Sequence, residues 1–205
     1  MLQAVADSRC FIIIDVGAFG KQSDEGVFAN SALSKLVDDS SKFPPDRCIP
    51  GYTVKLPYTF LCDDAYPLKQ NMMKPYSGNS LTAEQDIFNG QLSHARRCVE
   101  CAFRILANKW RLFLKNIEAK PKTDNTIVKC ETVLHNIVID RDGIPQDLLQ
   151  RVEEKVDSIW AFNASLNSGH RYNCSASSAL TVRNCWKEYF NSAAGAVLWQ
   201  AHYIK

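Results

Sequence analysis

The chain has 205 residues, of which 46% are hydrophobic and 22% charged, with a formal net charge of +2. This length and composition are typical of one folded domain with a buried core and exclude a chain that is disordered throughout. No apolar run is long enough to span a bilayer and no secretory leader pattern is present, so neither a membrane protein nor a secreted one is expected. The eight cysteines are therefore expected to be free thiols rather than a disulfide framework.

The charge is unevenly distributed along the chain. Residues 94–122 contain eight Lys and Arg residues and two acids, so this stretch carries +6 and the remainder −4. A basic patch on a near-neutral protein indicates a polyanionic partner. A solvated helix face is an alternative of about equal weight.

The first elements are predicted to be a hairpin. Residues 2–6 and 10–16 are apolar and are separated by a short polar turn. The unbroken run Phe11-Ile12-Ile13-Ile14 predicts that the second strand is covered on both faces. A helix capped by Ser23 or Asp24 is then expected to reach Val37, and residues 38–57 are expected to form a loop.

A third strand is predicted near residues 58–62, where the side chains are β-prone, and Pro67 prevents its ladder from continuing. Asp63 and Asp64 are thus expected at the carboxyl edge of a strand, where open α/β sheets place ligands. The alternative is that the two acids merely cap a turn.

The middle of the chain predicts helices. Thr82 and Gln85 form a capping box, and Asn89-Gly90 predicts a break before the next helix. That next helix carries an apolar stripe that is expected to face the core. The stripe consists of Val99, Phe103, Leu106, Trp110 and Phe113.

Glu100 lies at the border of this stripe, about 100° round from its middle. Arg96 and Arg104 lie one turn to either side, and Arg111 is expected on the same face. A strand-end Asp and a helix-borne Glu can together hold a divalent cation, since Mg²⁺ is usually bound through one or two carboxylates plus water and substrate phosphates. In the alternative, Glu100 pairs with its arginine neighbours.

The last third is predicted to be helical apart from one linker. Residues 127–139 are apolar at helical spacing and are expected to pack on the sheet, with His135 in a core or capping role. Residues 163–178 are predicted to be a flexible linker, and an amphipathic helix begins near Val182.

Four residues have the outline of a zinc site: Cys98, Cys101, Cys130 and His135. Cys98 and Cys101 fall inside the helical repeat rather than on a knuckle, so the cysteines are interpreted as incidental.

Many short signatures also occur in one order along the chain. They are Leu61-Cys62-Asp63-Asp64-Ala65-Tyr66-Pro67-Leu68, Met73-Lys74-Pro75-Tyr76, Leu81-Thr82, Phe88-Asn89, Ala95-Arg96-Arg97, Val99-Glu100, Ala102-Phe103, Trp110-Arg111 and Leu134-His135-Asn136. Together they resemble the DDE endonuclease domain of PIF/Harbinger transposases and the nucleases derived from them. The resemblance runs to about Asp140 and returns at the C-terminus. It implies an α/β, ribonuclease-H-like mixed sheet with flanking helices, and metal-dependent cutting of DNA.

The resemblance also implies roles for particular residues. The family uses an Asp, Asp, Glu triad, in which the second acid matches Asp63 and the Glu matches Glu100. These two are the expected catalytic residues and the expected ligands of Mg²⁺ or Mn²⁺. Asp24 matches a family Asp and is a candidate further ligand, with capping as its alternative role. The expected DNA-binding residues are Arg96, Arg97, Arg104, Lys109 and Arg111.

One departure from the family pattern concerns the first catalytic Asp, which lies in an Asp-Gly pair on a preceding strand. No such pair occurs upstream of Leu2; Asp142-Gly143 lies elsewhere, and the hairpin makes Asp15 a poor substitute. The expectation is a nuclease domain whose first, central strand is missing, which would cost a metal ligand and leave backbone groups unpaired. Residues 1–140 are then a partial DDE endonuclease domain, and residues 141–205 a linker and helical C-terminal tail.

Two functions follow. The first is a metal-dependent DNA endonuclease, and the second is a catalytically inactive derivative that binds DNA or a partner protein. The expected partners are DNA and a separate DNA-binding protein, with no membrane. The expected location is the nucleus, with the cytoplasm as an additional compartment.

Overall fold

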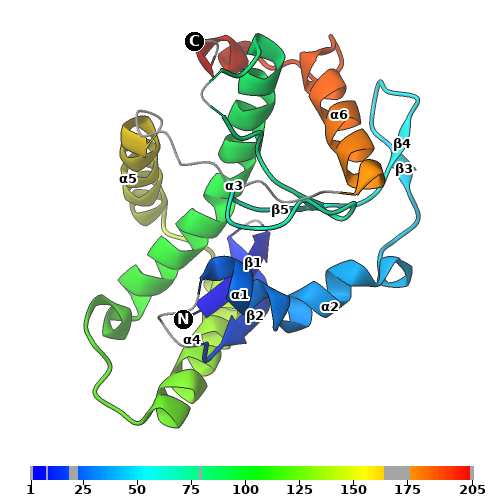
Figure 1. Cartoon of the computed structure of the whole chain (residues 1–205). Helices are drawn as coiled ribbons and strands as arrows, with labels where there is room; N and C mark the ends of the chain where they lie inside the picture. The colour runs from blue at the N-terminus through cyan, green and yellow to red at the C-terminus, as the bar shows by residue number, and fades with distance from the viewer. Residues whose placement is uncertain (1, 8, 19–22, 79, 164–175, 204–205) are drawn as a thin grey trace. The chain divides into compact units, whose positions relative to one another are not determined.

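The computed structural model describes residues 2–7, 9–18, 23–78, 80–163 and 176–203. It is a mixed α/β structure of two compact units whose segments alternate along the chain (Figure 1). The first unit comprises Met1–Gln22 and Arg97–Asn167, and the second comprises Ser23–Arg96 and Ser168–Lys205. The long helix α3 (Ala83–Lys109) contributes residues to both. Across the described ranges, no helix is long and apolar enough to cross a membrane. The domain division expected near residue 140 stays a prediction.

The first unit begins with the predicted hairpin, formed by β1 (Leu2–Asp7) and antiparallel β2 (Cys10–Val16). The register shifts after Val5, so that Ile12 is an extra residue in β2. Such a bulge turns the side chains that follow it. Phe11 and Ile14 consequently share one face although they are three residues apart, while Ile12 is 62% exposed. The prediction that β2 is covered on both faces is therefore wrong at Ile12.

The covered face of the hairpin packs on the second half of α3. Phe11 joins Ala102 and Leu106 in a buried cluster. Phe103, Trp110 and Phe113 pack against the same cluster, which confirms the predicted apolar stripe at every position except Val99, a half-buried residue outside the cluster. The helix itself ends at Lys109, and Phe113 lies in the following 3₁₀ turn η2 (Arg111–Leu114).

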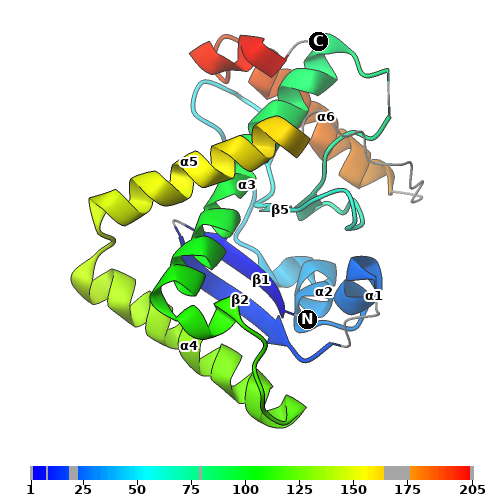
Figure 2. The same cartoon turned by 90° about the vertical axis from the view of Figure 1, so that its left-hand side faces the viewer.

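Helix α4 (Pro121–Asp142) runs beside β2, as Figure 2 shows. The Asn136 side chain binds the backbone of Phe11 twice: its Nδ2 donates to the carbonyl oxygen at 2.7 Å, and its Oδ1 accepts from the amide nitrogen at 2.9 Å. His135 Nε2 donates to the carbonyl oxygen of Arg9 at 2.9 Å. Arg9 is the turn residue with a positive φ of 75°. These side chains supply partners that buried backbone groups of the hairpin need.

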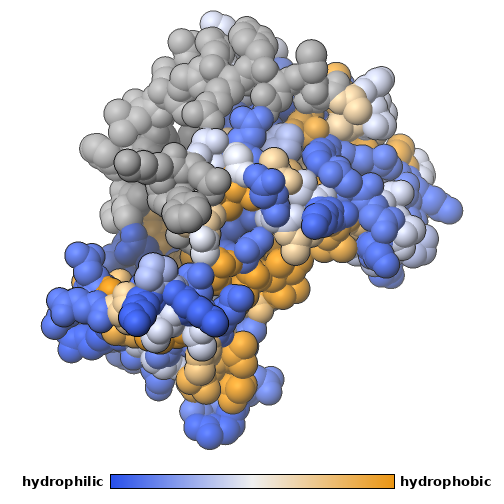
Figure 3. Space-filling model, turned by 60° about the horizontal axis from the view of Figure 1, so that its bottom comes forward, coloured by the Kyte–Doolittle hydropathy of each residue, from blue (hydrophilic) through white to orange (hydrophobic). Residues whose placement is uncertain are grey.

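The predicted packing of residues 127–139 on the hairpin is confirmed, but the face in contact differs from the apolar one. His135 and Thr132 are buried, whereas Val133, Leu134 and Ile137 are exposed. The space-filling view in Figure 3, which shows one face, has apolar surface exposed among polar groups. Specific hydrogen bonds to the hairpin backbone, rather than apolar burial alone, thus orient α4.

The first unit is completed by α5 (Gln146–Asn163). Val152 and Val156 of this helix are buried with Cys101 and Ile105 of α3. Glu153 forms an ion pair with Arg9 at 2.7 Å. The hairpin turn is therefore held by both α4 and α5.

The second unit begins with α1 (Asp24–Ala29) and α2 (Ala32–Asp38). Ser23 caps α1 as predicted, since its side chain accepts from the Gly26 amide. The single helix expected to reach Val37 is wrong, because buried Ser31 starts a new helix. Its Oγ donates to the Phe28 carbonyl at 2.7 Å and accepts from the Ser34 amide at 3.1 Å.

Short strands follow these helices. Residues 38–57 were expected to be a loop but contain the 3₁₀ turn η1 (Ser40–Lys42) and an antiparallel pair, β3 (Arg47–Cys48) with β4 (Lys55–Leu56). The predicted third strand is β5 (Phe60–Leu61), which pairs in parallel with β6 (Met72–Met73). Within the described residues the strands form three two-stranded sheets.

The core of the second unit lies between the first half of α3 and α6 (Ser177–Asn191), which are drawn side by side in Figure 1. Phe88 and Leu92 pack there with Ala179 and Val182. The predicted final helix is thus confirmed and begins a few residues earlier. It is followed by the 3₁₀ segment η3 (Leu198–Tyr203). Most of the predicted linker lies outside the described residues.

The start of α3 is the predicted capping box: Thr82 N donates to Gln85 Oε1, and Gln85 N donates to Thr82 Oγ1. The break predicted at Asn89-Gly90 is wrong, because α3 is continuous through both residues. The Asn89 amide binds the backbone N–H and carbonyl of Tyr76 at 2.8 and 2.9 Å, so it does not compete for the helix backbone. Gly90 is buried, where a small residue permits close packing.

His135 should make stability depend on pH. Burial lowers the pKa of His135 below 6.5, so this imidazole binds a proton less readily in the folded protein than in the unfolded chain. The free energy of unfolding is thus expected to fall as the pH drops below about 6.5. In His135→Gln, whose amide can still donate to Arg9, this fall should be smaller. Urea unfolding at pH 7.5 and 5.5 measures it, with exposed His94→Gln as control; an equal fall in parent and His135→Gln would contradict the assignment.

Candidate active site

The strand β5 ends at Leu61, and Cys62 lies between it and the two predicted acids. The Cys62 amide donates to the Met73 carbonyl at 2.9 Å, and the buried Cys62 thiol donates to the same oxygen at 3.2 Å. Burial, reinforced by the neighbouring Asp63 carboxylate, raises the pKa of Cys62 to about 12, so the thiol stays protonated. The prediction that Asp63 and Asp64 follow the carboxyl end of a strand is confirmed.

Asp63 keeps an accessible carboxylate. Its Oδ1 accepts from the Ala65 amide at 3.0 Å, which fixes the turn, and its Oδ2 lies 3.6 Å from Nη2 of Arg96. The Asp63 side chain is 44% exposed, whereas that of Arg96 is 18% exposed. Asp63 is therefore oriented by its neighbours while one side of the carboxylate remains open to a ligand.

Asp64 has a different environment. Lys74, which is 5% exposed, places its Nζ 3.3 Å from Asp64 Oδ1 and donates to the Asp64 carbonyl oxygen at 2.8 Å. Ser77 Oγ also donates to Oδ1, at 2.9 Å. Because its charge is balanced by an almost buried ammonium, Asp64 holds the loop together. Lys74 has no predicted role. The sequence signal for one is its position directly after the apolar pair Met72-Met73 of a buried strand, which indicates a buried lysine that needs a partner.

The other predicted ligands lie in separate parts of the fold. Glu100 is partly buried on α3 in the first unit, and Asp63 belongs to the second. Asp24 is the first residue of α1. Within the described residues, no group of three or more His, Cys, Asp or Glu is arranged to hold a metal ion. The convergence of Asp63, Glu100 and Asp24 on a metal stays a prediction.

The predicted DNA-binding residues divide between two elements. Arg96, Arg97, Arg104 and Lys109 are on α3, whereas Arg111 is on η2. The expectation that Arg111 shares a helix face with Glu100 is wrong, because the helix ends two residues before it. Lys109 and Arg111 are exposed, and Arg97 and Arg104 are partly so.

The cysteines of the zinc-like pattern have structural surroundings. Cys101 is buried beside Val152, and the Cys98 thiol points to the Ala6 carbonyl with a sulfur–oxygen distance of 3.7 Å. Burial raises the pKa of both thiols. Cys130 is exposed on α4 while His135 is buried, so these two residues face different sides of one helix.

Comparison with known proteins identifies the family of the chain. Residues 1–136 match the DDE superfamily endonuclease family. The chain belongs to this family. The "Protein ALP1-like" of Arabidopsis thaliana is 27% identical over 144 residues, covering 69% of this chain and 35% of the relative. The chain thus spans about a third of the length of that relative. No solved structure matches the chain significantly.

The match to the DDE endonuclease family includes Asp63, Glu100 and every predicted DNA-binding residue, and it ends at Asn136. Asn136, the last matched residue, is the one whose side chain binds the Phe11 backbone in β2. The family match assigns no role to individual residues, so the joint action of Asp63 and Glu100 stays a prediction.

The Lys74–Asp64 pair should contribute strongly to stability. Removing one partner of a nearly buried pair leaves the other charge uncompensated, so Lys74→Ala is expected to lower the free energy of unfolding by about 3 kcal/mol. The matched control Lys187→Ala breaks a pair with an exposed acid, Glu84, at 3.1 Å. It should cost less than about 1 kcal/mol. Equal losses for the two variants in denaturant unfolding would show that Lys74 does not hold the loop.

Proposed function

We propose that this chain forms part of a metal-dependent DNA endonuclease of the Harbinger type, with Asp63 and Glu100 as catalytic carboxylates. The observation that carries this proposal is the difference between two adjacent acids. Asp64 is neutralised by Lys74, whereas Asp63 is held at the end of β5 with its carboxylate partly exposed. An exposed, oriented carboxylate at such a strand end is suited to a ligand rather than to packing.

The donor set fits a hard divalent cation. Asp63 and Glu100 offer carboxylate oxygens, the ligands preferred by Mg²⁺ and by Mn²⁺. Asp63 Oδ2 meets Arg96 at 3.6 Å, which is longer than a close charge-assisted hydrogen bond. When bound, the cation supplies positive charge that stabilises the transition state of phosphodiester hydrolysis. Asp24 is a further candidate ligand under this proposal.

The protein's own residues have separate tasks. Arg96 positions the Asp63 carboxylate and adds positive charge beside it. Arg97, Arg104, Lys109 and Arg111 would bind phosphates along the DNA, since guanidinium groups match phosphate oxygens bidentately. The Ala65 amide prevents the Asp63 side chain from rotating away from the site.

The finer assignments also belong to the proposal. The family triad has three acids, and Asp63 and Glu100 match two of them. We assign the remaining acid, which is the first Asp of the triad, to a strand in a longer protein. That strand would lie in a ribonuclease-H-like sheet. The relative's greater length leaves room for such a segment. A DNA substrate places the activity in the nucleus, where a separate DNA-binding protein would select the target.

DNA binding should depend steeply on salt. If the basic residues track a phosphate backbone, each lost contact lowers the slope of log K against log [salt] by about one unit. Fluorescence anisotropy with a labelled duplex at several salt concentrations tests this for the parent and Arg104→Ala. The control is Arg151→Ala, which removes an exposed arginine of α5 paired with Asp147. A parental slope near zero would end the DNA interpretation.

Cleavage should require Asp63 and Glu100 but not Asp64. In a protein extended upstream by an Asp-bearing strand, Mg²⁺-dependent nicking of supercoiled plasmid is expected, and Asp63→Asn or Glu100→Gln should abolish it. Asp64→Asn leaves the Lys74 charge uncompensated and should lower stability, but it removes no proposed ligand. Its cutting rate per folded molecule should therefore stay about parental, with circular dichroism giving the folded fraction. Undiminished cutting by Glu100→Gln would refute the catalytic assignment. DNA binding without cutting in the extended parent would favour the inactive derivative.

A further inference from the structure

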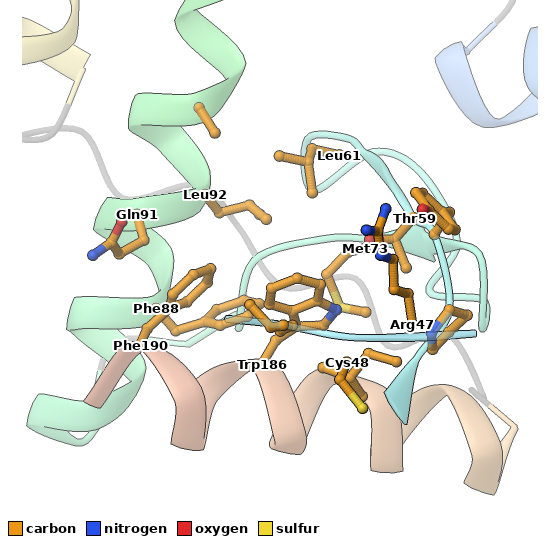
Figure 4. A pocket seen from close by; sticks show the side chains of 15 residues that line it. Arg47, Cys48, Thr59, Leu61, Met73, Phe88, Gln91, Leu92, Trp186 and Phe190 are labelled. Carbon is orange, nitrogen blue, oxygen red and sulfur yellow. The ribbon is translucent and has the colours of Figure 1, made fainter. Parts of the chain in front are cut away.

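The second unit contains an apolar cavity of about 350 Å³ that none of the proposed nuclease residues lines. Figure 4 shows side chains from the β3–β4 hairpin, from α3 and from α6 pointing into one space. The size is in the range of sites that hold ligands or anchoring side chains.

One wall of the cavity belongs to the folded core. Phe88, Leu92 and Met73 are almost completely buried in the main cluster of this unit. Trp186 and Phe190 of α6 pack against that cluster, and their ring centroids are 5.6 Å apart. Because close-packed interiors do not rearrange easily, this wall is preformed, and residues 47–61 with their short strands form the opposite side.

The apolar surface continues beyond the cavity. Tyr58 and Leu61 line it and are 43% and 42% exposed. Exposed apolar side chains gathered at a hollow are typical of interaction sites. A small molecule that filled the cavity would leave these two side chains in water. A chain segment with one anchoring side chain in the cavity would cover them.

Charge at the rim restricts the kind of segment. Arg47 is the one charged residue among the fifteen described residues that line the cavity, and it is exposed. Within the described part of the chain, no ion pair is formed by Arg47. A carboxylate on the occupant could therefore pair with it. DNA would gain little from the apolar walls, so a protein segment fits better.

We propose that this cavity is the docking site of a short acidic segment of a partner protein. The segment places a bulky apolar side chain in the cavity and an adjacent carboxylate on Arg47. Apolar anchors in preformed pockets supply most of the binding energy at such sites, and the charge pair adds orientation and specificity. This site does not depend on the proposed nuclease activity.

Cys48 provides the readout, because it lines the cavity and is exposed. The probe is the peptide acetyl-Ser-Glu-Leu-Phe-Glu-Ser-amide, and the measurement is the rate of iodoacetamide labelling by mass spectrometry on the full chain. At a peptide concentration about ten times Kd, labelling of Cys48 should slow about tenfold, since about one tenth of the sites remain free. Labelling of exposed Cys130, on α4, should not change.

Matched variants separate the two parts of the site. Ala95→Phe fills the cavity from α3, whereas Ala83→Phe adds the same ring at the exposed start of that helix, outside the cavity. Arg47→Glu reverses the rim charge, whereas Lys55→Glu makes the same change on the paired strand. Protection of Cys48 should be lost in Ala95→Phe and Arg47→Glu and kept in both controls, with circular dichroism confirming that each variant is folded.

Four outcomes would overturn the proposal. They are no protection of the parent at millimolar peptide, equal protection by a peptide with Ser-Ser in place of Leu-Phe, unchanged protection in Arg47→Glu, and a parental dimer that Ala95→Phe converts to a monomer in sedimentation. The last outcome would assign the cavity to a second copy of the chain.

Discussion

The nearly buried ammonium of Lys74 is the constraint on which the candidate active site depends. It pairs with the Asp64 side chain and also donates to the Asp64 carbonyl, so it holds both the loop and its charge. A lysine is seldom so deeply buried unless it is paired. Because Lys74 satisfies Asp64, the neighbouring Asp63 remains available beside Arg96. Asp63 and Asp64 are chemically identical neighbours, and the ion pair with Lys74 gives them different environments.

Side-chain amides solve a similar problem in each unit. Asn136 binds both backbone groups of Phe11, and Asn89 binds both backbone groups of Tyr76. In each case a helix supplies the donor and acceptor that a neighbouring extended segment lacks, as buried backbone groups require. Both asparagines belong to the signatures by which the chain resembles its family. At least part of these signatures therefore reflects how the scaffold is held together.

Elements defined by local rules could be predicted from the sequence. The hairpin follows from two apolar runs around a polar turn, the Thr82–Gln85 box from helix capping, and the position of Asp63 from a β-prone run that a proline ends. All three signals act over a few residues. The errors arose where tertiary contacts override such rules. Gly90 is accepted within α3, and α4 turns a polar face to the hairpin. The roles of Asp63 and Asp64 could not be separated, because local rules do not show which of two adjacent acids will pair with Lys74, ten residues further along the chain.

The two candidate sites differ in polarity, and they therefore suit different kinds of partner. The groups around Asp63 are charged and partly exposed to solvent. A cation that binds there can replace water ligands with carboxylate and phosphate oxygens with little rearrangement of the protein. The cavity beneath Tyr58 and Leu61 is apolar, so its occupant gains mainly by leaving water, and one arginine fixes its direction. Under the two proposals, DNA and a protein segment would therefore bind separate surfaces. Because Leu61 lines the cavity and ends β5, and Asp63 follows two residues later, a segment bound in the cavity would contact the strand that precedes the proposed catalytic acid.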